Sequence, residues 1–211
     1  MKEMSVVGKI LKRFFDIIVS FIGIICLSPI FFVLIIILLF VNKGRIFYLD
    51  ERVGKHHKNI NVLKFRSMYY DAETNIDKYL SEEQKEEWLR ERKIDNDPRI
   101  TKIGNFMRIT SIDELPQLFN IFAGTLSFIG PRPITERELI QHFTEEEQKL
   151  MLSVRPGLIS VWGVSGRNEI SFESGERQKL ELSYFEKLSL FRDLKILFQA
   201  IPAVLKRKGA K

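Results

Sequence analysis

The sequence predicts a mainly α-helical protein with one small β-hairpin, an α+β fold, attached to a membrane through its N-terminal part. Three observations lead to this prediction. Residues 17–41 contain no charged side chain, residues 46–68 read as two strands around a polar turn, and later segments carry helix-start signals or helical spacing. At 211 residues and 28% charged side chains, the chain suits one sizeable domain and is not a polytopic membrane protein.

The uncharged run at 17–41 predicts a membrane helix. A straight helix of 25 residues is about 37 Å long, and the hydrocarbon layer is about 30 Å thick. Ser28-Pro29 lies near its middle, and proline removes a backbone donor, so we expect a kink there. Basic residues, which prefer the cytoplasmic side, flank both ends. These features alone support equally a spanning helix and a re-entrant helix that bends and returns to the same face. Asp16 is expected to form an interfacial ion pair with the bases before the run.

The soluble part begins with the hairpin, whose strands we expect at 46–49 and 60–68. The segment 71–91 carries eight acids and three bases and predicts an exposed acidic helical region. Capping boxes are expected at Ser81 with Gln84 and at Thr144 with Glu147. From Tyr184 to Leu205, apolar residues recur at helical spacing with Asp193 on the opposite side, which favours an amphipathic helix at a membrane surface or packed on the core.

The charge distribution narrows the function classes. The net charge is +6, and the acidic segment contributes −5, so the rest of the chain carries +11. Such an excess suits a membrane surface, a nucleic acid or a phosphorylated substrate. No nucleic-acid motif is recognisable, and the bases cluster beside apolar segments. Cys26 is the one cysteine, which excludes an internal disulfide and a cysteine-based metal site.

Asp113-Glu114 is the candidate chemical centre. If Asp113 caps a helix, Pro116 falls where its missing N–H is harmless, so we predict a helix that starts at Asp113, with an exposed, ionised carboxylate. A simple helix cap would explain this dipeptide taken alone. Nearby arginines change the interpretation, because a fixed guanidinium is suited to two-point phosphate recognition; they are Arg108, Arg132, Arg155 and Arg167. An acidic pair among fixed arginines indicates a phosphoryl-transfer site.

Several motifs, taken in order, carry a resemblance. They are Glu51-Arg52-Val53-Gly54, Lys64-Phe65-Arg66-Ser67-Met68, Asn96-Asp97-Pro98-Arg99-Ile100-Thr101, Thr110-Ser111-Ile112-Asp113-Glu114-Leu115-Pro116-Gln117-Leu118, Gly130-Pro131-Arg132-Pro133, Arg155-Pro156-Gly157 and Ser165-Gly166-Arg167-Asn168. With them, the chain resembles the bacterial sugar transferases of the monotopic phosphoglycosyl transferase family over nearly its whole length.

The resemblance implies a magnesium-dependent transfer of a sugar 1-phosphate from a UDP-sugar to polyprenol (undecaprenyl) phosphate, with release of UMP, at the start of surface glycan assembly. It implies that Asp113 is the nucleophile and that Glu114 assists the metal or the deprotonation of the acceptor. Phosphate and substrate binding would fall to Lys64, Arg108, Arg132, Arg155 and Arg167. Ser28-Pro29 matches the helix-breaking pair of the family's re-entrant membrane helix.

The resulting prediction is an enzyme on the cytoplasmic face of the bacterial cytoplasmic membrane. Residues 1–45 would form the basic flank and re-entrant helix, and residues 46–211 the catalytic domain, held on anionic inner-leaflet lipids by basic side chains and the amphipathic C-terminal region. Gly163 stands where many relatives have Gln, which leaves the sugar undefined. A non-catalytic membrane-anchored scaffold is the alternative, and self-association as a homodimer stays open.

Overall fold

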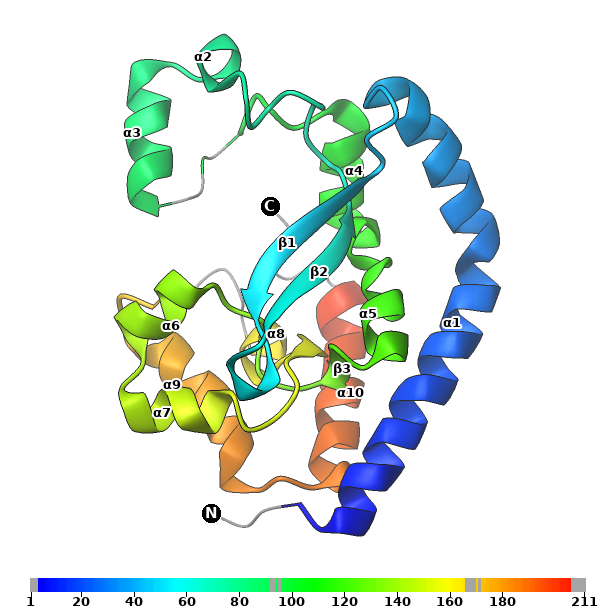
Figure 1. Ribbon diagram of the computed structural model, residues 1–211, viewed down its shortest axis with the longest axis vertical. Coiled ribbons are helices and arrows are strands. Elements are labelled where there is room, and N and C mark those ends of the chain that lie inside the picture. The colour runs from blue at the N-terminus through cyan, green and yellow to red at the C-terminus, as the bar shows by residue number, and fades with distance from the viewer. Residues whose placement is uncertain (1–3, 92–93, 95, 166–169, 171, 206–211) are drawn as a thin grey trace. The chain divides into compact units, whose positions relative to one another are not determined.

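The computed structural model describes residues 4–91, 94, 96–165, 170 and 172–205. Helices dominate, and β1 (Phe47–Val53) and β2 (Asn59–Phe65) form a small hairpin, so the predicted α+β class is confirmed at this level (Figure 1). The chain forms two compact units. The first unit contains the described residues of 1–27, 49–63 and 116–205, and the second unit contains 28–48 and 64–115.

The uncharged run lies in one long helix, α1 (Val6–Val41), which is long and apolar enough to cross a membrane. Pro29 lies inside α1, and the residues on both sides of it are helical. A proline deletes one backbone donor, and the hydrogen bonds of the neighbouring turns still hold the helix. The division between the two units falls between Leu27 and Ser28, beside this proline.

The core of the first unit surrounds a short parallel pair of strands, β3 (Ser127–Ile129) and β4 (Gly157–Ile159). Ser127 pairs with Gly157, and a Cβ atom on Gly157 would lie 2.1 Å from the backbone nitrogen of Gly130. Glycine is therefore required for this close approach. Helix α5 (Gln117–Ala123) lies against β3, and the first unit also contains α6 (Glu136–His142), α7 (Glu145–Met151), α8 (Val161–Val164) and α9 (Glu176–Ser183).

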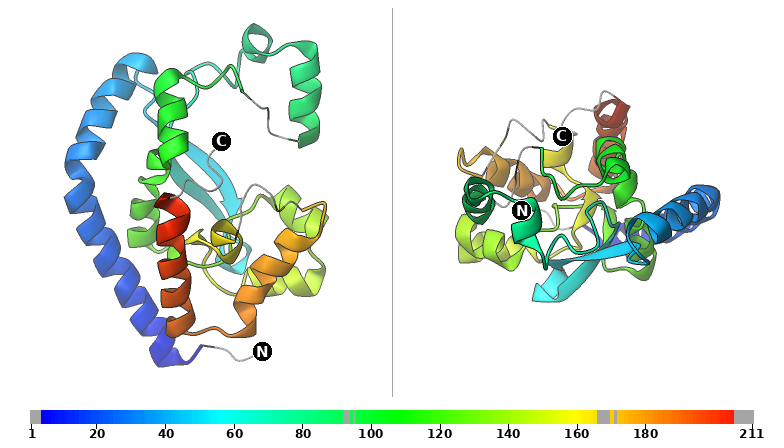
Figure 2. Two further views of the ribbon diagram at one scale, coloured as in Figure 1. Left: turned by 180° about the vertical axis from the view of Figure 1, so that it is seen from behind. Right: turned by 90° about the horizontal axis from the view of Figure 1, so that it is seen from above.

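The C-terminal helix, α10 (Leu190–Leu205), lies beside the N-terminal half of α1 within the first unit (Figure 2). It begins later than predicted, because Tyr184 and Phe185 are buried in a separate 3-10 turn, η3 (Tyr184–Glu186). Asp193 faces inward and accepts hydrogen bonds from Lys12 and Tyr184. The apolar stripe instead faces outward, with Phe191 79% and Phe198 67% exposed.

Asp16 is also buried, at 2% exposure, which corrects the expected interfacial ion pair. Its Oδ1 accepts hydrogen bonds from the backbone N–H of Phe128 and from the hydroxyl of Ser127. Asp16 therefore ties α1 to β3, and Lys12 makes a second tie by donating to the carbonyl of Ile129. The polar side chains of this helix serve its attachment to the core.

The second unit contains α2 (Ile76–Tyr79), α3 (Glu82–Glu91), α4 (Lys102–Thr110) and the 3-10 turn η2 (Ile112–Glu114). Phe65 at the end of β2 contacts Phe31 and Phe47, with ring centroids 5.6 and 5.5 Å away. The predicted capping box is present at Ser81 and Gln84, and the one at Thr144 and Glu147 starts α7 in the first unit.

Candidate active site

The Asp113-Glu114 pair lies in the 3-10 turn η2, between α4 and α5. Ser111 ends α4 in the left-handed conformation, with a φ of 56°, and its N–H donates to the carbonyl of Arg108. The following turn closes with a hydrogen bond from the Glu114 N–H to the Ser111 carbonyl. The predicted helix start at Asp113 is therefore wrong. Residues 112–114 form the single 3-10 turn η2, and helix α5 begins only at Gln117, after Pro116.

Asp113 is half-buried, which corrects the expectation of an exposed carboxylate. Burial, and secondly the nearby carboxylate of Glu114, raise the pKa of Asp113 to about 6. The positive charges of Lys64 and Arg108 act in the opposite direction. The structure thus brings four of the predicted site residues together within the second unit: Lys64, Arg108, Asp113 and Glu114.

Arg108 extends from the last turn of α4, and its Nε donates to the hydroxyl of Ser67 over 2.8 Å. Burial lowers the pKa of Arg108, and the negative charge of Asp113 opposes that shift. A guanidinium stays protonated throughout the physiological range, so it stands as a fixed cation near the acidic pair. Ser67 belongs to the Lys64-Phe65-Arg66-Ser67-Met68 motif, and no other feature of the sequence marks it as a partner of Arg108.

A buried ion pair supports the loop that leads into α4. Both carboxylate oxygens of Asp97 accept from the side chain of Arg99, with Arg99 Nη2 2.7 Å from Oδ2. Asp97 is 8% exposed and Arg99 5%, and the Arg99 guanidinium lies over the ring of Trp88. A buried pair of this kind is strongly destabilising to break, because the partner is left as an uncompensated charge. The Asp97-Pro98-Arg99 motif therefore shapes the backbone beside the site.

Arg132 belongs to a different cluster, in the first unit. Its backbone N–H donates to Glu181 Oε2, and its guanidinium lies 5.3 Å from the ring centre of Trp162. Arg177 lies over the same indole, at 4.2 Å, and its pKa is lowered to about 10, chiefly by burial. Glu181 is buried, accepts from the hydroxyl of Ser160, and has a raised pKa because of that burial.

The sequence did not predict three members of this cluster as site residues: Trp162, Arg177 and Glu181. They come from α8 and α9, elements whose spacing alone predicted no site. A Cβ atom on Gly163 would lie 3.5 Å from the Ser160 hydroxyl oxygen, an ordinary contact distance. Position 163 therefore has room for a Cβ atom.

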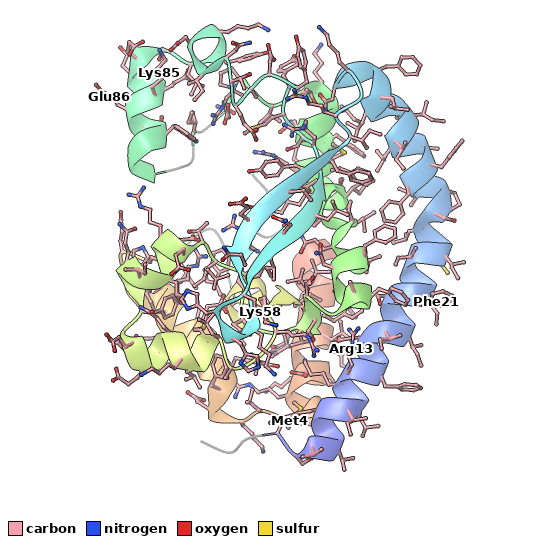
Figure 3. The ribbon with its side chains drawn as sticks, in the orientation of Figure 1. Met4, Arg13, Phe21, Lys58, Lys85 and Glu86 are labelled. Atoms are coloured by element: carbon pink, nitrogen blue, oxygen red, sulfur yellow. The ribbon has the colours of Figure 1, made fainter. Side chains whose placement is uncertain are left out.

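Arg155 serves the end of a helix in the same unit. Its Nε donates to the carbonyl of Gly124, which follows α5, over 2.6 Å. Arg13 donates to the carbonyls of Ile121 and Phe122 at the same helix end, and Figure 3 shows its side chain directed from α1 toward α5. Cations are favourable beside the negative end of a helix. Arg167 lies outside the described residues.

Within the described part of the chain, no three His, Cys, Asp or Glu side chains gather to hold a metal ion. Mg²⁺ is commonly held by one or two carboxylates together with waters and substrate phosphates. The adjacent carboxylates of Asp113 and Glu114 fit a magnesium ion of that kind, which shares its coordination with a phosphorylated substrate.

Comparison with known proteins shows the family of this chain. The sequence profile of the bacterial sugar transferases matches residues 7–207. The chain is 36% identical over 206 residues to the exopolysaccharide production protein ExoY of Rhizobium meliloti (strain 1021), covering 97% of this chain and 89% of that protein.

Two longer relatives match through part of their length. An uncharacterised sugar transferase of Haemophilus influenzae is 43% identical over 207 residues, which is 96% of this chain and 42% of that protein. The undecaprenyl-phosphate galactose phosphotransferase of Salmonella typhimurium is 37% identical over 208 residues, with the same two coverages. The acidic pair with its neighbouring cations, and the match over nearly the whole chain, lead to one conclusion: this protein is a transferase that belongs to the bacterial sugar transferase family.

Proposed function

We propose that this enzyme transfers a sugar 1-phosphate from a UDP-sugar to polyprenol phosphate and releases UMP, through a covalent phosphosugar on Asp113. The observation that carries the proposal is the half-buried Asp113 beside Glu114, with Lys64 and Arg108 as its neighbouring cations. The name of the Salmonella relative, a galactose phosphotransferase that uses undecaprenyl phosphate, supports a lipid phosphate as acceptor.

In the first step, a carboxylate oxygen of Asp113 attacks the β-phosphorus of the UDP-sugar. The new O–P bond forms as the bond from that phosphorus to the bridging oxygen breaks, and UMP leaves with the bond electrons. In the second step, a phosphate oxygen of the polyprenol phosphate attacks the same phosphorus. The acyl-phosphate bond breaks, which regenerates the Asp113 carboxylate and yields a polyprenyl diphosphate sugar. Two displacements of this kind divide one difficult transfer into two.

The surroundings of Asp113 suit a nucleophile of this type. With a pKa of about 6, most of Asp113 is ionised at neutral pH, and its burial removes the hydration that would weaken its attack. Lys64 and Arg108 attract the phosphates and oppose the negative charge that gathers at phosphorus. Arg132, in its own cluster, is proposed to contact the donor, and Arg155 and Arg167 remain proposals for nucleotide-sugar binding.

A magnesium ion is part of the proposal. Asp113 and Glu114 would hold it together with the donor phosphates, and it would supply positive charge against the diphosphate. Glu114 either shares in that coordination or accepts a proton from the acceptor phosphate. In both roles its carboxylate must stay beside Asp113, where it already raises the pKa of that group.

The proposed location is the inner face of the bacterial cytoplasmic membrane. α1 exposes large apolar side chains along its length, including Phe14, Phe32 and Phe40, and α10 exposes Phe191 and Phe198. Exposed apolar surface of this extent suits contact with lipid. With bases on both flanks, α1 is proposed to enter and return to the cytoplasmic side near Ser28-Pro29, held by anionic lipids.

The test uses the purified full chain in detergent or nanodiscs, a panel of UDP-sugars, undecaprenyl phosphate and magnesium. Wild-type enzyme should release UMP with at least one donor, and Asp113→Asn should abolish the release. Asp77→Asn changes an exposed aspartate on α2 and is the matched control, expected to keep wild-type activity. Activity in Asp113→Asn would remove the covalent role, and wild-type enzyme with no UMP release on any common UDP-sugar would contradict the proposed reaction.

A further inference from the structure

We infer that Ser67 is a positioning residue for Arg108, whose hydroxyl sets the direction of the guanidinium beside Asp113. This inference rests on the proposed function, because it assigns Arg108 to the phosphate that Asp113 attacks. Ser67 lies two residues after β2 and three after Lys64, and it is buried at 8% exposure. All the contacts that carry the inference lie within the second unit.

The key contact is the hydrogen bond of 2.8 Å from Arg108 Nε to Ser67 Oγ. A guanidinium has five N–H donors in one plane, arranged along two usable edges. A hydrogen bond at Nε fixes that plane and directs the other edge, made by the two terminal nitrogens, away from the serine. That edge is the one that binds two oxygens of a phosphate at once. Ser67 therefore acts on substrate only through the orientation of Arg108.

Ser67 is itself held in place by the first turn of the helix that carries Arg108. Its carbonyl accepts from the backbone N–H of Thr101 at 3.0 Å and lies 3.3 Å from the Thr101 hydroxyl. At Gly104, a Cβ atom would lie 1.8 Å from that carbonyl oxygen, so only glycine permits the contact. The backbone of Ser67 thus holds the start of α4, and its side chain holds the last turn.

The last turn of α4 connects this contact to the acidic pair. The Arg108 carbonyl accepts from Ser111, the left-handed residue that turns the chain into η2. The nearby carboxylate of Asp97 accepts hydrogen bonds from Arg99 through both of its oxygens. Among the residues that the structure describes, Ser67 supplies the hydrogen bond to the Arg108 side chain, while Asp113 acts on it through charge.

A double-mutant cycle tests this inference. Ser67→Ala removes the acceptor, and Ser67→Cys replaces it with a weak one at nearly constant volume. Each should lower kcat for UMP release by about tenfold or more, because a hydrogen bond to a charged group is lost. Each should also move the acidic limb of the pH profile upward, since the cation that favours ionised Asp113 is no longer fixed. Asn105→Ala, on the exposed side of α4, is the control and should change neither.

The decisive arm uses Arg108→Lys, which lacks Nε. In that background, Ser67→Ala should lower the remaining rate by less than about twofold, because the contact is already gone. Equal losses in both backgrounds, or folded Ser67→Ala and Ser67→Cys enzymes with wild-type kcat and pH profile, would overturn the inference. The double-mutant cycle measures only the energetic coupling between Ser67 and Arg108. Retained activity in Asp113→Asn would instead remove the covalent role, whatever the cycle shows.

Discussion

The raised pKa of Asp113 makes the first half-reaction sensitive to pH in a defined direction. The shift from the ordinary 3.8 to about 6 corresponds to roughly 3 kcal/mol against the ionised form. At pH 5, one unit below that pKa, about a tenth of Asp113 would be ionised, whereas an aspartate of ordinary pKa would be more than about nine-tenths ionised. Only the ionised form attacks, so the rate at limiting UDP-sugar, which reports the free enzyme, should rise about tenfold between pH 5 and pH 7.

The assay is single-turnover release of UMP in the absence of lipid acceptor, from pH 4.5 to 8.5 at constant ionic strength. Omitting the acceptor matters because phosphate monoesters also titrate near pH 6. Glu114→Gln removes a negative neighbour and should move the limb to lower pH, and Arg108→Gln removes a positive neighbour and should move it to higher pH. A flat wild-type profile, or limbs that stay fixed in both variants, would refute the assignment of this titration to Asp113.

Three further predictions concern stability and packing. Asp113→Asn should raise the free energy of unfolding, measured by denaturant titration, by about 1–3 kcal/mol at pH 7.5 and leave it unchanged below about pH 4. The reason is that the pKa of Asp113 is raised in the folded state, so the stabilising protonated form is lost as pH rises through about 6. An equal gain at both pH values would contradict this reasoning. Gly157→Ala should fail to fold, because its Cβ would lie 2.1 Å from a backbone nitrogen, while Gly163→Ala, with its nearest contact at 3.5 Å, should melt within about 2 °C of wild type. Similar melting temperatures for the two would refute the packing. Asp193→Ala should destabilise by about 3–5 kcal/mol because Lys12 loses its buried partner, and Lys12→Met with Asp193→Leu should restore most of the loss in thermal unfolding; an additive double variant would count against the pair.

Local signals predicted much of the secondary structure. The uncharged run became α1, and the caps at Ser81 and Thr144 start helices as expected. Strands β3 and β4 escaped prediction because three residues are too few to show alternation, and their pairing joins segments about 30 residues apart. Long-range pairing of this kind leaves no local pattern.

The sequence predicted which residues form the site, but it did not predict their burial or their hydrogen-bond partners. Lys64, Arg108, Asp113 and Glu114 were named in advance, and the structure places them together. The predicted exposure of Asp113 was wrong, because a helix-cap pattern carries no information about which distant segments bury the side chain. Polar positions tied to other elements were missed for the same reason: Asp16, Asp193, Ser67 and Glu181 acquire their partners only when the chain folds.

The covalent intermediate on Asp113 is the central claim, and peptide-level mass spectrometry after mixing enzyme with an accepted UDP-sugar, magnesium and no lipid acceptor tests it most directly. We predict that the peptide containing Asp113 gains the mass of one sugar phosphate, that UMP appears in equal amount, and that polyprenol phosphate then discharges the adduct. UMP release without any adduct under rapid quenching, or an adduct on another residue, would contradict the account.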